Sequence, residues 1–250
     1  MAQIPHTAMV LAAGLGTRMR PLTDHLPKPL IKVAGKPLID WTLDRFAGAG
    51  VRRAVVNVHY RADQMEAHLA GRRSPQIVIS DERALLLETG GGLKKAAAHL
   101  GTDPVYCSNT DAILVDGAGP EPCAALAAAW RDEAMDALLL LVPIGLASGY
   151  DGAGDFALKP NGTLDWRSGD HAPFVYTGLQ IIRPALLGGA PEGPFSLRLL
   201  WDKASAGGRM RGVVHDGPWM HVGDSQGLAL AEAFFDKRMN DPSAVKRVHR

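Results

Sequence analysis

The sequence predicts an α/β fold in which a mixed, mostly parallel sheet is flanked by helices, and two observations support this prediction. Short apolar runs alternate with longer segments of helical periodicity through the first two-thirds of the chain. Strands separated by helices of about 10–15 residues form right-handed crossover units, which bring parallel strands side by side. The expected architecture is therefore Rossmann-like.

The individual elements of this first part follow from local patterns. Residues 37–49 place Leu38, Trp41, Thr42 and Phe46 on one helical face, and Gly50 ends the pattern. The apolar run 137–144 is typical of a strand buried on both faces. The expected strands are residues 8–11, 51–58, 76–80, 105–108 and 137–144, and the expected helices are residues 37–49, 62–70, 92–100 and 122–135.

From about residue 143 the pattern changes to antiparallel elements. Asn161-Gly162 between residues 155–159 and 163–166 predicts a hairpin. We then expect a strand over 173–182, a helix over 196–206, one or two strands within 210–221, and a final helix over 225–239. We expect one domain over 1–250, with halves at about 8–142 and 143–239 and a frayed basic tail at 240–250.

Composition excludes several classes of protein. With 27 Lys+Arg against 26 Asp+Glu the net charge is +1, so the chain lacks the field that attracts nucleic acid or an anionic membrane. Two cysteines exclude a disulfide scaffold, and Cys107 is expected to be a buried strand thiol. No signal peptide and no apolar run of about 20 residues is present, so we expect a cytoplasmic protein.

A glycine-rich loop, residues 11–23 (LAAGLGTRMRPLT), follows the first strand. No Gly-Lys-Ser/Thr follows it, and Met19 stands where a dinucleotide fingerprint needs glycine. The loop instead combines small residues, whose backbone N–H groups can approach phosphate, with the cations Arg18, Arg20 and Lys28. Gly-x-Gly alone would favour a turn with surface charges, whereas the whole pattern favours phosphoryl chemistry.

Residues 11–23 together with Pro-Lys-Pro (27–29) resemble the signature of the sugar-1-phosphate nucleotidyltransferases. The resemblance implies that the loop holds a triphosphate, that Arg18 binds the leaving pyrophosphate, and that Lys28 contacts phosphate at the reacting centre. It makes residues 8–142 the nucleotide-binding half. The nucleotide-binding residues that it implies are Leu11, Ala12, Ala13, Gly14, Gly16, Thr17, Arg18, Asn57, Thr89, Gly90 and Asn109.

Residues 56–60 (VNVHY) and 88–93 (ETGGGL) also resemble this family, in particular its short bacterial members acting on N-acetylmuramate 1-phosphate with UTP. There the segment matching Thr89, Gly90 and Gly91 seats the base through backbone groups. An equally good interpretation is a helix N-terminus with Thr89 as the N-cap, and a helix N-terminus is itself an anion site.

Asp111 follows a predicted parallel strand, and its carboxylate oxygens suit Mg²⁺, which the resemblance implies as cofactor. Thr110 replaces a glycine usual in the family, and a turn-forming role for Asp111 remains open. The second carboxylate of the family is replaced by His221, while Asp224, three residues later, is a second candidate metal ligand or the N-cap of the last helix.

The resemblance places sugar binding in the half over 143–239, whose antiparallel hairpins are expected to form a lid on the sugar side. Residues 174–179 (FVYTGL) resemble the strand whose Thr and Gly face the hexose. Lys159 matches a lysine on sugar phosphate in larger relatives, or is a solvated hairpin lysine. The sugar-binding candidates are Lys159, Thr177, Gly178, Trp201 and Asp202.

Taken together, the expected activity is transfer of a nucleotidyl group from a nucleoside triphosphate to an α-sugar 1-phosphate, with Arg18, Lys28 and Asp111 as the catalytic residues. UTP with N-acetylmuramate 1-phosphate, as in peptidoglycan recycling, is the first choice of substrates, and GTP with mannose 1-phosphate is the second. A non-catalytic nucleotide-binding regulatory module is the alternative from another class. The oligomeric state is left open between monomer and weak dimer.

Overall fold

The structure, a computed structural model, describes residues 4–240. The strands are β1 (Thr7–Leu11), β2 (Lys32–Val33), β3 (Lys36–Pro37), β4 (Arg53–Val58), β5 (Gln76–Asp81), β6 (Val105–Asn109), β7 (Ala112–Leu114), β8 (Ala137–Pro143), β9 (Ala147–Ser148), β10 (Phe156–Leu158), β11 (Leu164–Trp166), β12 (Phe174–Ile182), β13 (Met210–Val214) and β14 (Trp219–His221). The α-helices are α1 (Leu38–Gly48), α2 (Ala62–Leu69), α3 (Glu88–Leu100), α4 (Pro122–Ala129), α5 (Arg198–Ala206) and α6 (Ser225–Asn240).

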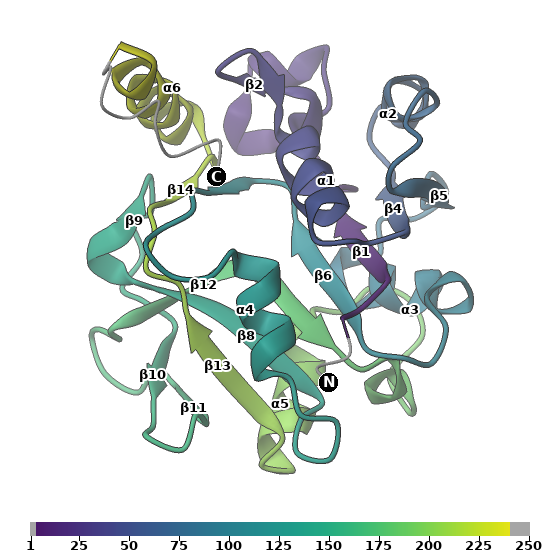
Figure 1. Cartoon of the computed structure of the whole chain (residues 1–250). Coiled ribbons are helices and arrows are strands. Elements are labelled where there is room, and N and C mark those ends of the chain that lie inside the picture. The colour runs from purple at the N-terminus through teal and green to yellow at the C-terminus, as the bar shows by residue number, and fades with distance from the viewer. Residues whose placement is uncertain (1–3, 241–250) are drawn as a thin grey trace.

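A nine-stranded mixed sheet runs through the molecule (Figure 1). Its main path is β11-β10-β12-β6-β1-β4-β5, and β8 and β13 join it through β12. β1 pairs in parallel with β4 and β6, and β4 pairs in parallel with β5, whereas β12 is antiparallel to both β6 and β8. The predicted α/β fold, with parallel strands first and antiparallel strands in the C-terminal half, is confirmed.

Helices cover both faces of this sheet because successive strand residues point to opposite sides. On one face, Ala8 and Val10 of β1 pack in a cluster with side chains from α1, α2 and α4. On the other face, Met9 packs in a cluster with Leu93 of α3 and Leu200 of α5. Full burial of each large apolar side chain contributes ~1.5–3 kcal/mol, so these two layers hold the strand ends in place.

A third apolar cluster lies beneath α6, at the upper left of Figure 1, next to the small sheet β7-β14-β9. Phe235 of α6 stacks on Trp41 of α1 with ring centroids 4.9 Å apart, and Glu232 accepts a hydrogen bond from the backbone N–H of Ala34 at 3.0 Å. The fully or largely buried members of the cluster are Met19, Ile31, Val33, Leu38, Ile113, Met220, Val222 and Ala231.

Two predicted helix boundaries were wrong. α3 begins at Glu88 rather than residue 92, so Gly90, Gly91 and Gly92 lie inside its first turns. α4 ends at Ala129 rather than residue 135, since Trp130 takes an extended conformation and its Nε1 donates to Oδ1 of Asp132 at 2.7 Å. The short strands β2, β3, β7 and β9 were not predicted, because each has a partner distant in the sequence or consists of only two residues.

Two other expectations, the hairpin and the buried cysteine, were met. The hairpin around Asn161-Gly162 is formed by β10 and β11, with Gly162 at φ 81°, and it extends the main sheet beside β12. Cys107 is a fully buried residue of β6. The frayed tail expected at 240–250 falls, beyond Asn240, outside the described residues. Among the described helices, none combines the length and the apolar character needed to cross a bilayer.

Candidate functional site

A cavity of about 460 Å³ opens at the carboxyl ends of β1 and β6. The chain passes from β1 to β4 and β5 on one side and returns to place β6 on the other, so the strand order reverses beside β1. Open α/β sheets bind ligands in the crevice at such a reversal. The cavity is lined by Leu11, Ala12, Ala13, Gly14, Leu15, Gly16, Thr17, Arg18, Lys28, Pro29, Asn57, Leu86, Glu88, Thr89, Asn109, Thr110, Asp111 and Gly223.

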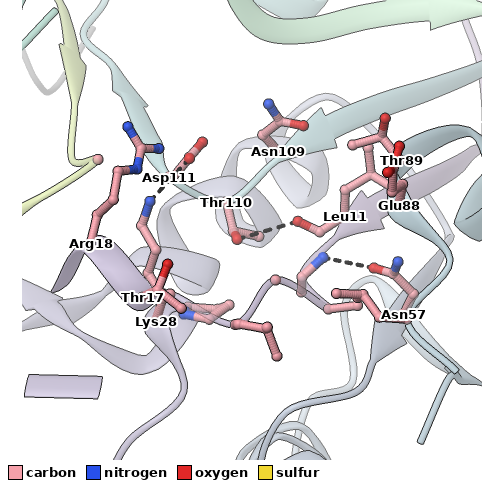
Figure 2. Close-up of a pocket in the computed structure, with 18 residues that line it drawn as sticks. Leu11, Thr17, Arg18, Lys28, Asn57, Glu88, Thr89, Asn109, Thr110 and Asp111 are labelled. Carbon is pink, nitrogen blue, oxygen red and sulfur yellow. Dashed lines mark hydrogen bonds and ion pairs between the residues drawn. The ribbon is translucent and has the colours of Figure 1, made fainter. Parts of the chain in front are cut away.

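Most of the predicted site residues meet at this cavity, although they come from five separate segments of the chain. Figure 2 shows Arg18, Lys28 and Asp111 gathered at one end, and Asn57, Glu88 and Thr89 at the other. The predicted nucleotide-binding residues in the lining are Leu11, Ala12, Ala13, Gly14, Gly16, Thr17, Arg18, Asn57, Thr89 and Asn109. Gly90 and the predicted sugar-binding residues are not part of this lining.

Gly16 allows the loop to turn back on itself. Its φ of 65° lies in the left-handed region, and a Cβ there would lie 2.9 Å from Cγ2 of Thr23 and 3.0 Å from Cβ of Lys28. Thr23 donates through Oγ1 to the carbonyl oxygen of Gly16 at 2.8 Å. Glycine is therefore required by both conformation and space, and the turn presses the loop against Lys28.

Lys28 and Asp111 form the charged centre of the cavity. Nζ of Lys28 lies 3.0 Å from Oδ2 of Asp111, and Nε2 of His221 lies 3.7 Å from the same oxygen. Burial alone raises the pKa of Asp111, but the neighbouring His221 and the charge of Lys28 outweigh it and hold this pKa well below its usual range. The carboxylate is thus ionised at neutral pH and able to bind a cation.

Asp224 has a different environment. Its Oδ1 accepts the backbone N–H of Gly227 at 2.9 Å, which makes it the N-cap of α6. That hydrogen bond lowers the pKa of Asp224, and Arg18 adds a smaller effect in the same direction. Arg20, which the loop pattern also suggested as a phosphate cation, forms an exposed pair with Asp24 at 3.4 Å instead.

The first turn of α3 connects the two halves of the chain. The backbone N–H groups of Gly90 and Gly91 donate to the carbonyl oxygen of Phe195 at 2.8 and 3.0 Å. Oγ1 of Thr89 accepts the backbone N–H of Leu197 at 2.9 Å, so Thr89 does not cap α3, whose N-cap position is Leu87. These amides therefore hold the segment before α5 and do not face an open anion site.

We expect Gly90→Ala to lower the free energy of unfolding by about 1–3 kcal/mol, the usual cost of overpacking. An added Cβ would lie 2.5 Å from Cε2 and 2.9 Å from the carbonyl oxygen of Phe195. Urea unfolding measures the change. Gly48→Ala, at a helical position with nothing within 4 Å of the added Cβ, is the control and should be neutral or stabilising. Equal stability of both variants would contradict the packing described.

The predicted sugar-binding residues are dispersed. Thr177 is buried, and its Oγ1 donates to the carbonyl oxygen of Leu140 at 3.0 Å, within the irregular pairing of β12 with β8. Gly178, at φ 92°, lies against the side chain of Asn109 at the cavity wall. Lys159 pairs with Asp165 on the exposed hairpin at 2.8 Å.

Trp201 and Asp202 lie on α5, which covers the same face of the sheet as α3. Nε1 of Trp201 donates to Oε1 of Gln180 at 2.8 Å, and its ring meets Tyr176 edge-on at 4.9 Å between centroids. Asp202 pairs with Arg198, one turn earlier, at 3.9 Å. None of the five candidates therefore lines the cavity, although Gly178 lies against one of its residues, Asn109.

Several lining residues were missed by sequence reasoning. Glu88 has φ 58°, an uncommon conformation for a residue with a Cβ, and it is exposed at the cavity. Gly223 enters from the segment after β14, where a Cβ would lie 2.5 Å from Cε1 of His221. Gly223 stands between His221 and Asp224, the two residues considered as metal ligands, and Glu88 opens the family-like segment 88–93, although neither was named as a site residue.

Comparison with known proteins agrees with this geometry. A family model described as the MobA-like NTP transferase domain matches residues 8–143. An N-acetylmuramate alpha-1-phosphate uridylyltransferase of Caulobacter vibrioides is 51% identical over 238 residues, covering 93% of this chain and 98% of the relative. One of Neisseria meningitidis serogroup B is 35% identical over 229 residues, covering 90% and 96%.

A solved structure shares the fold at low sequence identity. The inositol-1-phosphate CTP transferase of T. maritima superposes with a TM-score of 0.73 at 16% identity and covers 99% of both chains. The family model, the relatives that align over nearly the full length and the shared fold all agree with a cavity placed where the strand order reverses. The chain therefore belongs to the MobA-like NTP transferase family.

Proposed function

We propose that this protein transfers the uridylyl group of UTP to N-acetylmuramate α-1-phosphate, giving UDP-N-acetylmuramate and pyrophosphate. An oxygen of the sugar phosphate attacks the α-phosphorus of UTP, and the bond from that phosphorus to the β-phosphate oxygen breaks in line. The reaction would serve peptidoglycan recycling in the cytoplasm, where nucleoside triphosphates are available.

One observation carries this proposal. The cavity is lined both by loop residues 11–17, which offer backbone N–H groups, and by the ion pair of Lys28 with Asp111, which follows the neighbouring strand β6. Such a cavity offers N–H donors for phosphate oxygens and fixed charge where the bond is made and broken. The choice of UTP and of N-acetylmuramate phosphate is supported by two relatives of that activity, which align with nine-tenths or more of the chain.

In the proposed roles, the loop from Ala13 to Thr17 holds the triphosphate and Arg18 stabilises charge on the departing pyrophosphate. Arg18 is exposed at the cavity mouth, where its side chain can follow the leaving group. Lys28, largely shielded from solvent, is placed to contact the reacting phosphates. Asn109 and Gly178 lie against each other at the cavity wall, and the sugar phosphate would bind on that side of the cavity.

Mg²⁺ is the proposed cofactor, and the residues of the cavity fit it. Among residues 4–240 no group of three or more His, Cys, Asp or Glu side chains is placed to hold a metal ion. Mg²⁺ in phosphoryl-transfer sites often takes one or two carboxylates, completed by water and substrate phosphate. Asp111 would provide that carboxylate, with His221 beside it, while Asp224 caps α6. When bound, Mg²⁺ would neutralise charge on the phosphate oxygens.

A substrate panel tests the proposal. Purified protein is assayed for pyrophosphate release with UTP or GTP, each paired with N-acetylmuramate 1-phosphate or mannose 1-phosphate, with Mg²⁺ and with excess chelator. UTP with N-acetylmuramate 1-phosphate should give the highest kcat/KM, and the chelator should abolish it. Tight binding of UTP without turnover in any pair would instead support a regulatory nucleotide-binding protein.

A further inference from the structure

Glu82, directly after β5, is a completely buried acidic residue outside the cavity lining. Its Oε1 accepts a hydrogen bond from Nδ2 of Asn57 at 2.8 Å. Its Oε2 accepts the backbone N–H of Leu87 at 3.2 Å. A buried carboxylate that accepts hydrogen bonds from two separate segments is costly unless both bonds are made, so its partners are held firmly.

The hydrogen bonds continue from Glu82 to the glycine-rich loop. Oδ1 of Asn57 accepts the backbone N–H of Ala12 at 2.7 Å, and Figure 2 shows this contact at the edge of the cavity. Ala12 belongs to the wall proposed to hold phosphate, whereas Leu87 directly precedes the lining residues Glu88 and Thr89. One carboxylate thus connects the two opposite walls of the cavity through Asn57.

Packing leaves the hydrogen-bonded pair of Asn57 and Glu82 little room to move. α3 lies directly over it: a Cβ at Gly92 would lie 2.7 Å from Nδ2 of Asn57 and 2.8 Å from Oε1 of Glu82. The missing side chain at position 92 is what lets the helix approach the two polar groups. Displacement of either group would therefore move the start of α3 as well.

The direction of these hydrogen bonds, from donor to acceptor, defines the role of Glu82. Because Ala12 donates, the oxygen of the Asn57 amide must face the loop, and its NH₂ group must face residue 82. Leu87 also donates, so residue 82 has to accept at both of its polar atoms. We propose that Glu82 is a positioning residue, which fixes the orientation of the Asn57 amide and thereby the spacing of the two cavity walls. The inference rests on the proposed function for its choice of UTP as the ligand.

Swapping the carboxylate and the amide between positions 82 and 57 tests the inference. Glu82→Gln places an NH₂ group against a donor, either Asn57 or Leu87, and we expect about 10–100-fold weaker binding of UTP. Asn57→Asp sets two carboxylates against each other in a buried site and should weaken binding to a similar extent. In the double variant the carboxylate at position 57 accepts from Ala12 and from the new amide, whose oxygen accepts from Leu87. Binding should return to within about fivefold of the unmodified protein.

Dissociation constants for UTP are measured by calorimetry, with KM and kcat from the pyrophosphate assay and thermal midpoints for every variant. Asp81→Asn is the control, since it removes a neighbouring, exposed carboxylate while its bond from the Arg83 N–H can persist. A structural role alone would lower the midpoint of Glu82→Gln without raising the KM for UTP. That result, or folded single variants whose defect the double variant does not reverse, would overturn the inference.

Hydrogen exchange provides a readout that does not depend on UTP. The amides of Ala12 and Leu87 should exchange faster in Glu82→Gln and regain their protection in the double variant. Unchanged exchange in Glu82→Gln would contradict the positioning role. Failure of the unmodified protein to bind UTP, with the exchange pattern as expected, would reject the proposed nucleotide and leave the positioning role supported.

Discussion

Replacing Asp111 by asparagine is expected to lower kcat/KM for pyrophosphate release by roughly a thousandfold. The change keeps the shape of the side chain but removes the negative charge that faces Lys28 at 3.0 Å and His221 at 3.7 Å. It also removes the carboxylate proposed to hold Mg²⁺ at the cationic end of the cavity. Steady-state kinetics with varied Mg²⁺ concentration measure the loss.

Asp224→Asn is the matched control for this prediction. Asparagine is as good an N-cap as aspartate, so α6 should keep its first turn and kcat/KM should stay within about threefold. Thermal midpoints of both variants separate lost activity from lost folding. A larger loss of activity for Asp224→Asn than for Asp111→Asn would overturn the assignment of Asp111 as the metal ligand.

Replacing Lys28 by methionine should reduce kcat by about 100–1000-fold with a much smaller effect on the thermal midpoint. Methionine keeps most of the stem that packs against Gly16, where a Cβ would already lie 3.0 Å from Cβ of Lys28. The charge beside Asp111 is lost, together with the donor that is placed to contact the reacting phosphates. Single-turnover measurements at saturating UTP would assign the effect to the chemical step.

Arg20→Met provides the comparison for Lys28→Met. Arg20 belongs to the same glycine-rich loop, but its guanidinium pairs with Asp24 on the surface and does not line the cavity. Its replacement should change kcat less than about twofold, in keeping with the small contribution of exposed ion pairs. If Lys28→Met kept kcat within threefold of the unmodified protein, Lys28 would not act on the reacting phosphates.

The sequence predicted those elements that are determined by their own pattern. The apolar run over 137–144 and the run over 8–11 became β8 and β1, because a short apolar run is typical of a strand covered on both faces. The segments of the site that follow β1 and β6 were also predicted, since the end of a parallel strand places the next residues at one edge of the sheet.

The remaining features depend on contacts between distant residues. Glycines 90–92 disfavour a helix locally, yet they lie within α3. Only glycine fits at these three positions, because Phe195, the Gly193 carbonyl and the pair formed by Asn57 and Glu82 leave no room for a Cβ. The inward turn of the Thr177 hydroxyl follows from the irregular pairing of β12 with β8, which a single strand does not encode. An acidic residue such as Glu82, between charged neighbours, has the local pattern of an exposed turn.

The cluster beneath α6 has a consequence for synthesis of the protein. Met19 and Ile31, which support the glycine-rich loop, pack with Val222 and Ala231, about 190–210 residues later in the chain. At ~5–20 residues per second, a ribosome needs about 10–40 s to make the chain between Met19 and Ala231. During that time the nascent chain exposes the apolar side of its loop, the kind of surface that chaperones bind. The support of the loop is therefore completed only after residues 222–231 have been made.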